Sequence, residues 1–353
     1  MQQCPKHHQL WGLPATVTQA RAFVGLPIPA TEGVLLTLSA TDVLADAQRC
    51  AHGLRQDLGR WLEQSNLMDG PCRNQGGEDE ANYALTWFPH YLISGDDAVL
   101  TRFRSLLADL ARWVASSCLH GYEAAAEAHH GTEPFLMFLP RYLGLVPDDD
   151  VARALLEDAA HHIGNWVAEI PPWYDYERDV FRSYAIGSRV VDDAPQYQIE
   201  LTEHLRFIHI ALAAHRVLGE DRYLQWALRY GARRAERLVA AAEPLPLAWD
   251  LDGTQLHWQD AGERPHLASM CALSHKMPND PLGGVENHLA SGAVMAYADL
   301  YAASGDKLFQ QAAGRIIAPL IEQLADPWAD PAAAALSHYR QAFGDTSFDA
   351  AAL

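Results

Sequence analysis

The sequence lacks several features that would place it outside the class of ordinary globular proteins. No apolar run reaches the length of about 18 residues that a transmembrane helix needs. The opening stretch, MQQCPKHHQLWGLP, has no apolar core of the kind that a signal peptide requires. The five cysteines are scattered without a C-x-x-C pair, which argues against a disulfide framework. We therefore expect a cytoplasmic protein with free thiols and no membrane association.

Basic residues are scarce relative to acidic ones. The chain of 353 residues carries 26 Lys and Arg against 45 Asp and Glu, which gives a formal net charge of -19. A surface of this sign repels nucleic-acid phosphates and anionic lipid headgroups, so we expect no nucleic-acid partner. An anionic small molecule stays compatible with the sequence, because a local arginine cluster can reverse the sign inside a pocket.

Helical periodicity is the main feature that the sequence does have. Its hydrophobic fraction of 49% is ordinary for a globular protein and allows a sizeable core. Four stretches share a polar start, an apolar-periodic run, a glycine-containing turn and a second helix rich in Ala, Leu and Arg. They are residues 79–114, 133–167, 203–239 and 286–324. We predict that each forms a helical hairpin in an all-α fold.

The turns between these helices resemble one another. In HYLISGDDAVL, HRVLGEDRYL and LYAASGDKLF, a glycine can end one helix in the left-handed conformation and an acidic residue can cap the next. A degenerate copy, RYLGLVPDDDVARALL, uses Pro147 and three aspartates instead. The turn glycines are unequally spaced, at Gly95, Gly144, Gly219 and Gly305. This spacing favours a closed toroid with elaborated loops over an open solenoid of identical repeats.

Two stretches interrupt the helical pattern, at residues 170–198 and 244–281. Within the second, apolar and polar residues alternate on both sides of Asp252-Gly253, which is a good turn pair for a β-hairpin. We expect a small hairpin insertion near 247–260. Neither stretch has the low complexity of a linker, so we expect a single domain over residues 1–353.

The turn that contains Leu300-Tyr301 and Ser304-Gly305-Asp306 carries a family resemblance. Together with the repeated hairpins, it resembles the six-hairpin, (α/α)6-toroid carbohydrate enzymes. This group includes glycoside hydrolases, unsaturated-uronyl hydrolases, toroid polysaccharide lyases and the N-acylglucosamine 2-epimerase superfamily. The resemblance covers approximately residues 79–325 and implies that the first helices of the hairpins start around the mouth of one pocket. No family-specific catalytic motif matches, so no residue roles are carried over.

A polar cluster lies near the start of the first helix in each hairpin. The members of the four clusters are Glu78, Asp79, Glu80 and Asn82; His129, His130 and Glu133; Glu200, Glu203, His204 and Arg206; and Glu286, Asn287 and His288. Helix capping alone explains carboxylates and asparagines at such positions. It does not explain a histidine in three of the four clusters. If the ring closes, the clusters meet and form an active site.

Glycoside hydrolysis is the chemistry that we favour, because carboxylates occur at every helix start. It needs two carboxyl groups with separated pKa values, for which Glu133, Glu203 and Glu286 are the candidates. We expect Glu133 and Glu286 to act as acid and base. Elimination or epimerisation of a sugar uses histidine or tyrosine instead. The histidines that would then lead, and that would otherwise fix hydroxyl groups, are His130, His204 and His288.

Further residues are candidates for binding the substrate. The segment PPWYDYERDVFRSY offers aromatic faces for pyranose rings and arginines for carboxylates. The binding candidates are Asp79, Glu80, His129, Trp173, Tyr174, Tyr176, Arg178, Arg182 and Asn287. The plain alternative is that Trp173, Tyr174 and Phe181 only pack this loop over helix ends.

We predict no cofactor, and a divalent metal held by His129 or His130 with Glu133 is the less favoured alternative, since no H-E-x-x-H motif occurs. The expected substrate is a small saccharide, with uronic-acid-containing saccharides included.

Two other classes of protein stay open. A terpenoid or other natural-product cyclase or dehydratase would need an aromatic-lined pocket, and no D-D-x-x-D motif is present. A non-enzymatic helical scaffold would need an exposed groove without buried ionisable groups.

Overall fold

The computed structural model describes residues 40–64, 74–118, 120–124, 132–257, 260, 282–323 and 333–349. These residues are mostly helical, with eleven α-helices and two small antiparallel sheets. The chain divides into two compact units, of which one is Met1–Leu67 with Leu353 and the other is Met68–Ala352. The single domain expected from the sequence stays a prediction.

The described part of the first unit is one long helix, α2 (Ala40–Gln64). Two ion pairs between residues three apart lie along its surface, Asp46 with Arg49 and Asp57 with Arg60. Leu44 and Leu54 are exposed. The helix was not among the predicted hairpins, because its sequence has no glycine turn of the repeated type.

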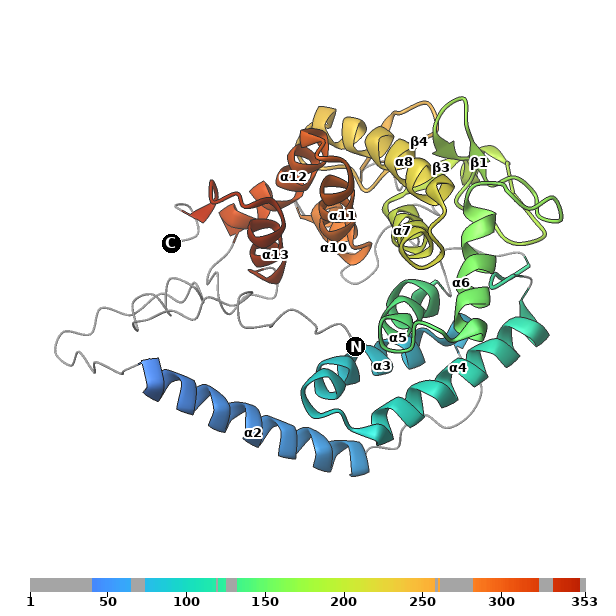
Figure 1. The fold of residues 1–353 in the computed structure, drawn as a ribbon. Helices are drawn as coiled ribbons and strands as arrows, with labels where there is room; N and C mark the ends of the chain where they lie inside the picture. Colours follow the sequence, from blue (N-terminus) through green and yellow to red (C-terminus); the bar gives the residue numbers. More distant parts are fainter. Residues whose placement is uncertain are drawn as a thin grey trace. The chain divides into compact units, whose positions relative to one another are not determined.

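The second unit contains the four predicted hairpins (Figure 1). Their helices are α3 (Asn74–Ser94) with α4 (Asp97–Ser117), α5 (Leu139–Leu145) with α6 (Asp150–Ile163), α7 (Arg206–Leu218) with α8 (Asp221–Ala240), and α11 (Ala293–Ser304) with α12 (Lys307–Gln323). A short element precedes three of the first helices: the π-helix η2 (Pro134–Phe138), the 3-10 helix η4 (Thr202–Leu205) and α10 (Gly283–Ala290). A final helix, α13 (Ala333–Phe343), packs on α11 and α12.

Successive hairpins pack side by side. Among the first helices, α3 packs on η2, α5 on α7, and α7 on α11. Among the second helices, α4 packs on α6, and α8 packs on α12. The helix η4 also contacts α10, although about eighty residues separate them in the chain. This contact brings two of the predicted polar clusters next to each other.

Three of the four turn glycines adopt the predicted left-handed conformation. Their φ angles are 65° at Gly95, 75° at Gly219 and 72° at Gly305. The backbone N–H of each glycine donates a hydrogen bond to the carbonyl four residues earlier, as Gly219 does to His215, and this bond ends the helix. Gly144 differs because α5 continues to Leu145. The local chemistry of the turns therefore fixes where these helices end.

The predicted acidic caps form where the side chain is aspartate. Asp96 accepts a hydrogen bond from the amide of Ala98 at 2.9 Å, and Asp306 accepts one from Leu308 at 2.9 Å. Asp149 caps α6 in the same way. The prediction is wrong for Glu220, whose side chain pairs with Arg222 and makes no cap. Glutamate carries an extra methylene group and is not among the residues that favour the N-cap position.

The β-hairpin expected near 247–260 is confirmed. Strand β4 (Ala248–Asp250) pairs antiparallel with β5 (Gln255–Leu256), and Gly253 in the turn has a φ of 98°. An unpredicted third strand, β3 (Ile199–Leu201), pairs with the other edge of β4. A second sheet joins β1 (Tyr174–Asp175) to β2 (Val180–Phe181). Strand β3 matters for the site because it leads directly into η4.

Two findings bear on the expected environment of the chain. None of the described helices combines the length and the apolarity needed to cross a bilayer. Cys50 and Cys118 form no disulfide bond. The remaining cysteines, Cys4, Cys72 and Cys271, lie outside the described residues.

Candidate functional site

Ionisable and other polar side chains are buried together near the starts of the first helices of three hairpins. We call this set the polar centre. Its members are Glu133, Glu200, Glu203, His204, Arg206, Arg234, Arg237, Asn287 and His288. All are at most 8% exposed, apart from Arg206 with a side-chain exposure of 16%. Burying so many charges costs free energy unless they are paired, so the contacts within the set are informative.

Glu133 and Arg206 join the second hairpin to the third. Glu133 directly precedes the π-helix η2, and Arg206 is the first residue of α7. Nη1 of Arg206 donates a hydrogen bond to Oε1 of Glu133, and the carboxylate is 4% exposed. π-helical turns are rare, and a large share of those known lie at functional sites. The sequence placed both residues near helix starts, in the second and third clusters, but it did not predict that they pair.

Glu200 holds the most completely buried ion pairs of the polar centre. Its Oε2 lies 3.0 Å from Nη1 of Arg234 and 2.8 Å from Nη1 of Arg237, and the carboxylate is fully buried. Oε1 accepts a hydrogen bond from the amide of Phe181 at 3.2 Å. Arg234 also stacks over the ring of Trp249, with 4.8 Å between Cζ and the ring centroid. The carboxylate of Glu200 therefore links strand β3 to helix α8 and, through Arg234 and Trp249, to strand β4.

Glu203 is a buried carboxyl group with a raised pKa. Burial raises this pKa, and hydrogen bonds from its own backbone and from Thr202, together with the charges of Arg206 and Arg234, oppose the shift without cancelling it. The Thr202 hydroxyl donates to Oε2 at 3.1 Å, whereas Oε1 has no hydrogen-bond partner among the described residues. A carboxyl group in such a place is suited to holding and donating a proton.

Two predicted histidines belong to the polar centre. His204 lies against Phe181, with 4.6 Å between ring centroids, and His288 lies edge-on to Trp249 at 5.8 Å. Nδ1–H of His288 donates to the carbonyl oxygen of Gly284 at 2.7 Å, so Nε2 carries the lone pair of the neutral ring. Burial lowers the pKa of His288 to about 4, and the nearby charge of Arg234 acts in the same direction.

Helix α10, which carries His288, sits close to another segment of backbone. A Cβ atom at Gly284 would overlap the carbonyl oxygen of Leu245. Asn287 on the same helix is 4% exposed, and its Nδ2 has no hydrogen-bond partner among the described residues. Glu286 is only half-buried. This helix therefore offers a donor group, a neutral imidazole and a more accessible carboxylate.

The first predicted cluster, at residues 78–82, has no described polar side chain, and the second cluster is described only at Glu133. Asp79 and Glu80 lie within α3, and their side chains are outside the described residues, as are His129 and His130 altogether. The backbone of α3 packs against η2, next to Glu133. The structure thus brings together members of the second, third and fourth clusters and leaves the meeting of the first with them as a prediction.

The aromatic and arginine segment divides into buried and exposed residues. Trp173 and Tyr174 are 0% and 1% exposed, and Trp173 donates its indole N–H to the carbonyl of Gly187 at 2.9 Å. Their rings are covered by protein, as expected for a loop packed over helix ends. Tyr176 is 38% exposed, and Arg178 and Arg182 are exposed as well. Of the five binding candidates in this segment, only these last three are exposed to solvent.

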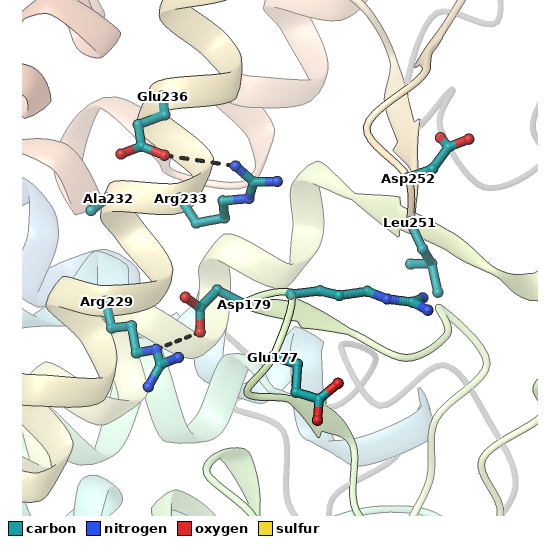
Figure 2. Close-up of a pocket in the computed structure, with 9 residues that line it drawn as sticks. Glu177, Asp179, Arg229, Ala232, Arg233, Glu236, Leu251 and Asp252 are labelled. Atoms are coloured by element: carbon teal, nitrogen blue, oxygen red, sulfur yellow. Dashed lines mark hydrogen bonds and ion pairs between the residues drawn. The ribbon is translucent and has the colours of Figure 1, made fainter.

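A separate surface pocket of about 830 Å³ lies between this segment, α8 and the β4–β5 turn (Figure 2). Its lining residues are Glu177, Arg178, Asp179, Arg229, Ala232, Arg233, Glu236, Leu251 and Asp252. Arg229 pairs with Asp179, and Arg233 lies 3.7 Å from Glu236 (Figure 2). The pocket includes the predicted Arg178 but no member of the polar centre.

Comparisons with protein-family models, with curated proteins and with solved structures find no match to this chain.

Proposed function

We propose that this chain is a carbohydrate-active enzyme, a glycoside hydrolase acting on a small saccharide, and that the polar centre holds its catalytic groups. The observation that carries the proposal is that carboxylates and histidines from residues 133, 203–206 and 286–288 are gathered by the fold. Glu133 forms an ion pair with Arg206, and the charge of Arg206 also lowers the pKa of Glu203. The charge of Arg234 lowers the pKa of both Glu203 and His288.

The proposal also includes the architecture. Hairpins that pack side by side, with polar residues at the starts of their first helices, support an (α/α) toroid whose pocket opens at those starts. The π-helical turn at Glu133 adds support, because such turns are frequent at functional sites. Uronic-acid-containing saccharides stay among the proposed substrates, since Arg206 lies beside the two carboxyl groups.

Each group has a proposed role in the hydrolysis. Glu203, whose pKa is raised by burial, donates a proton to the leaving oxygen. Glu133, paired with Arg206, is the charged partner that acts as base or nucleophile, and the half-buried Glu286 is the second candidate for that role. Asn287 and His288 hold hydroxyl groups of the sugar. These assignments move the acid from Glu133, where the sequence put it, to Glu203.

Elimination or epimerisation is the second candidate function. The specific observation in its favour is the neutral imidazole of His288, whose Nδ1–H is already engaged by Gly284. Its Nε2 lone pair can accept a proton, although a pKa of about 4 makes it a weak base. Buried charge of this density disfavours both a hydrocarbon cyclase pocket and a scaffold without chemistry.

A panel of aryl glycosides and short oligosaccharides, including uronides, tests the proposal in water enriched in oxygen-18. Hydrolysis adds one labelled oxygen to a product. Elimination gives an unsaturated, ultraviolet-absorbing product without the oxygen label. Epimerisation leaves the mass unchanged in oxygen-18 water, and in a separate reaction in D2O the product takes up deuterium. We expect Glu203→Gln to lower turnover by at least about a hundredfold, while Glu236→Gln in the surface pocket has no effect. Unchanged turnover in Glu203→Gln and Glu133→Gln would contradict the proposal.

The pH dependence gives an independent check. A proton donor must be protonated to act, so kcat should fall as the pH rises through the pKa of Glu203. Glu203→Gln should remove this limb of the profile.

A further inference from the structure

A second group of ionisable residues lies outside the polar centre, at the end of α6. It consists of His120, Asp158 and His162, whose potential ligand atoms all lie within 4.8 Å of one another. Nδ1 of His120 is 2.7 Å from Oδ1 of Asp158, and Nε2 of His162 is 4.0 Å from the same oxygen. Within the part of the chain that the structure describes, no other three histidine, cysteine or acidic residues meet in this way.

His162 is the residue that ordinary packing does not explain. It is 1% exposed, and neither ring nitrogen has a hydrogen-bond partner among the described residues. The distance of 4.0 Å to Asp158 is too long for a hydrogen bond. A buried ring nitrogen that has no other partner is available to offer its lone pair to a metal ion.

The backbone at His120 is strained in a way that brings its ring to the same place. Its φ of 56° is in the left-handed region, which few residues other than glycine adopt, and Gly121 follows with a φ of 85°. Such strain is concentrated at functional sites. Here it places the His120 ring 4.5 Å from the ring of His162, measured between centroids.

The surroundings leave one side of the group open. Tyr122 and Trp173 cover His162 from within, with centroid distances of 5.7 Å and 6.3 Å. On the outer side, the side chains of His120 and Asp158 are 26% and 39% exposed. Water can therefore reach the group and complete a coordination shell.

We propose that His120, Asp158 and His162 bind one divalent transition-metal ion of the Zn²⁺ type, which fastens residues 120–124 to the end of α6. Two imidazoles with one carboxylate suit Zn²⁺ and its neighbours, whereas Mg²⁺ and Ca²⁺ prefer oxygen ligands. With metal–ligand distances of about 2.0 to 2.2 Å, ligand atoms lie about 3.3 Å apart in a tetrahedral site. The 2.7 Å and 4.0 Å separations reach that value by shifts of less than about 1 Å.

The test uses the full chain after treatment with a chelator. Zn²⁺ is titrated by calorimetry, Co²⁺ binding is followed by its visible absorption, and Mg²⁺ serves as the negative ion. The variants are His120→Gly, Asp158→Asn and His162→Gln. His120→Gly is the sharpest, because glycine tolerates the left-handed backbone and should leave the metal-free fold at least as stable. We expect each variant to lose one bound equivalent or at least about tenfold in affinity, together with the Zn²⁺-induced rise in Tm.

His161→Gln is the matched control. This neighbouring histidine already contacts Glu157, Arg222 and Tyr223. We expect it to bind Zn²⁺ as the parent chain does. Zn²⁺ binding of unchanged stoichiometry and affinity in both His120→Gly and His162→Gln, or no Zn²⁺ binding by the parent chain, overturns the proposal. Neither result bears on the glycosidase roles of Glu133 and Glu203.

Discussion

Helix α8 contributes arginines to two very different places, the polar centre and the surface pocket. Arg234 and Glu200 have side-chain exposures of 1% and 0%, whereas Arg233 and Glu236 have 40% and 59%. The residue types are the same, and Arg233 and Arg234 are adjacent in the chain. A desolvated charge depends strongly on its partner, while water supports an exposed charge almost as well as the partner does. Burial, rather than residue type, therefore decides how much the folded state depends on each ion pair.

Removing the charge of Glu200 should give the largest effect. Glu200→Gln leaves Arg234 and Arg237 buried without a counter-charge, and we expect the free energy of unfolding to fall by about 3 to 5 kcal/mol. Urea denaturation at pH 7 measures the loss. A loss no larger than that of Glu236→Gln would abolish the distinction between the two regions.

Acid should weaken the polar centre through His288. Its folded-state pKa of about 4 lies below the unfolded value of 6.5, so the unfolded chain binds the proton first as the pH falls. Stability from this residue is complete above pH 6.5 and is lost towards pH 4, by on the order of 3 kcal/mol. Between pH 8 and pH 4, the free energy of unfolding should fall less steeply in His288→Gln than in the parent chain. Identical pH dependence in the two proteins would refute the assignment.

Glu203 should behave in the opposite way to Glu200. Because its pKa is raised, its buried charge destabilises the fold above the unfolded-state pKa, and Glu203→Gln should raise Tm by a few degrees Celsius at pH 8. The gain should shrink towards pH 4, where the carboxyl group is protonated in both states. Differential scanning calorimetry at both pH values checks this. A fall in Tm at pH 8 would place Glu203 among the structural ion pairs.

The smallest effect should come from the surface pocket. We expect the Arg233 and Glu236 pair to have a coupling energy below about 1 kcal/mol in a double-mutant cycle, and to weaken further in high salt. Arg233→Ala, Glu236→Ala and the double variant provide the cycle. A coupling energy comparable to the loss in Glu200→Gln would show that this pocket is effectively desolvated.

The features that could be predicted from the sequence are those that local chemistry decides. Gly95, Gly219 and Gly305 end helices because a residue without a Cβ adopts the left-handed conformation easily. Asp252-Gly253 forms its hairpin for a related reason. The gathering of Glu133, His204 and His288 was also anticipated, because each cluster occupies the same place in a repeated hairpin.

What could not be predicted depends on partners far away in the chain. Strand β3 is three residues long, and nothing in its sequence shows that Glu200 pairs with α8. Arg234 and Arg237 are spaced for one helix face, but the arginines of an arginine-rich helix are normally solvated. The pair His161-His162 resembled other adjacent histidines in the chain. Only the fold shows that His162 meets His120, whose backbone conformation leaves no trace in the sequence.

Gly284 has two separate effects on its surroundings. Because it has no side chain, α10 can approach the backbone at Leu245, where a Cβ atom at position 284 would overlap the carbonyl oxygen. Its own carbonyl oxygen accepts a hydrogen bond from Nδ1–H of His288 one helical turn later, and this selects which nitrogen keeps its hydrogen. A methyl group at position 284 would force α10 away from Leu245, but the hydrogen bond lies within the helix and moves with it. One residue thus combines a packing contact with the choice of a histidine tautomer, and only the packing contact depends on its lacking a side chain.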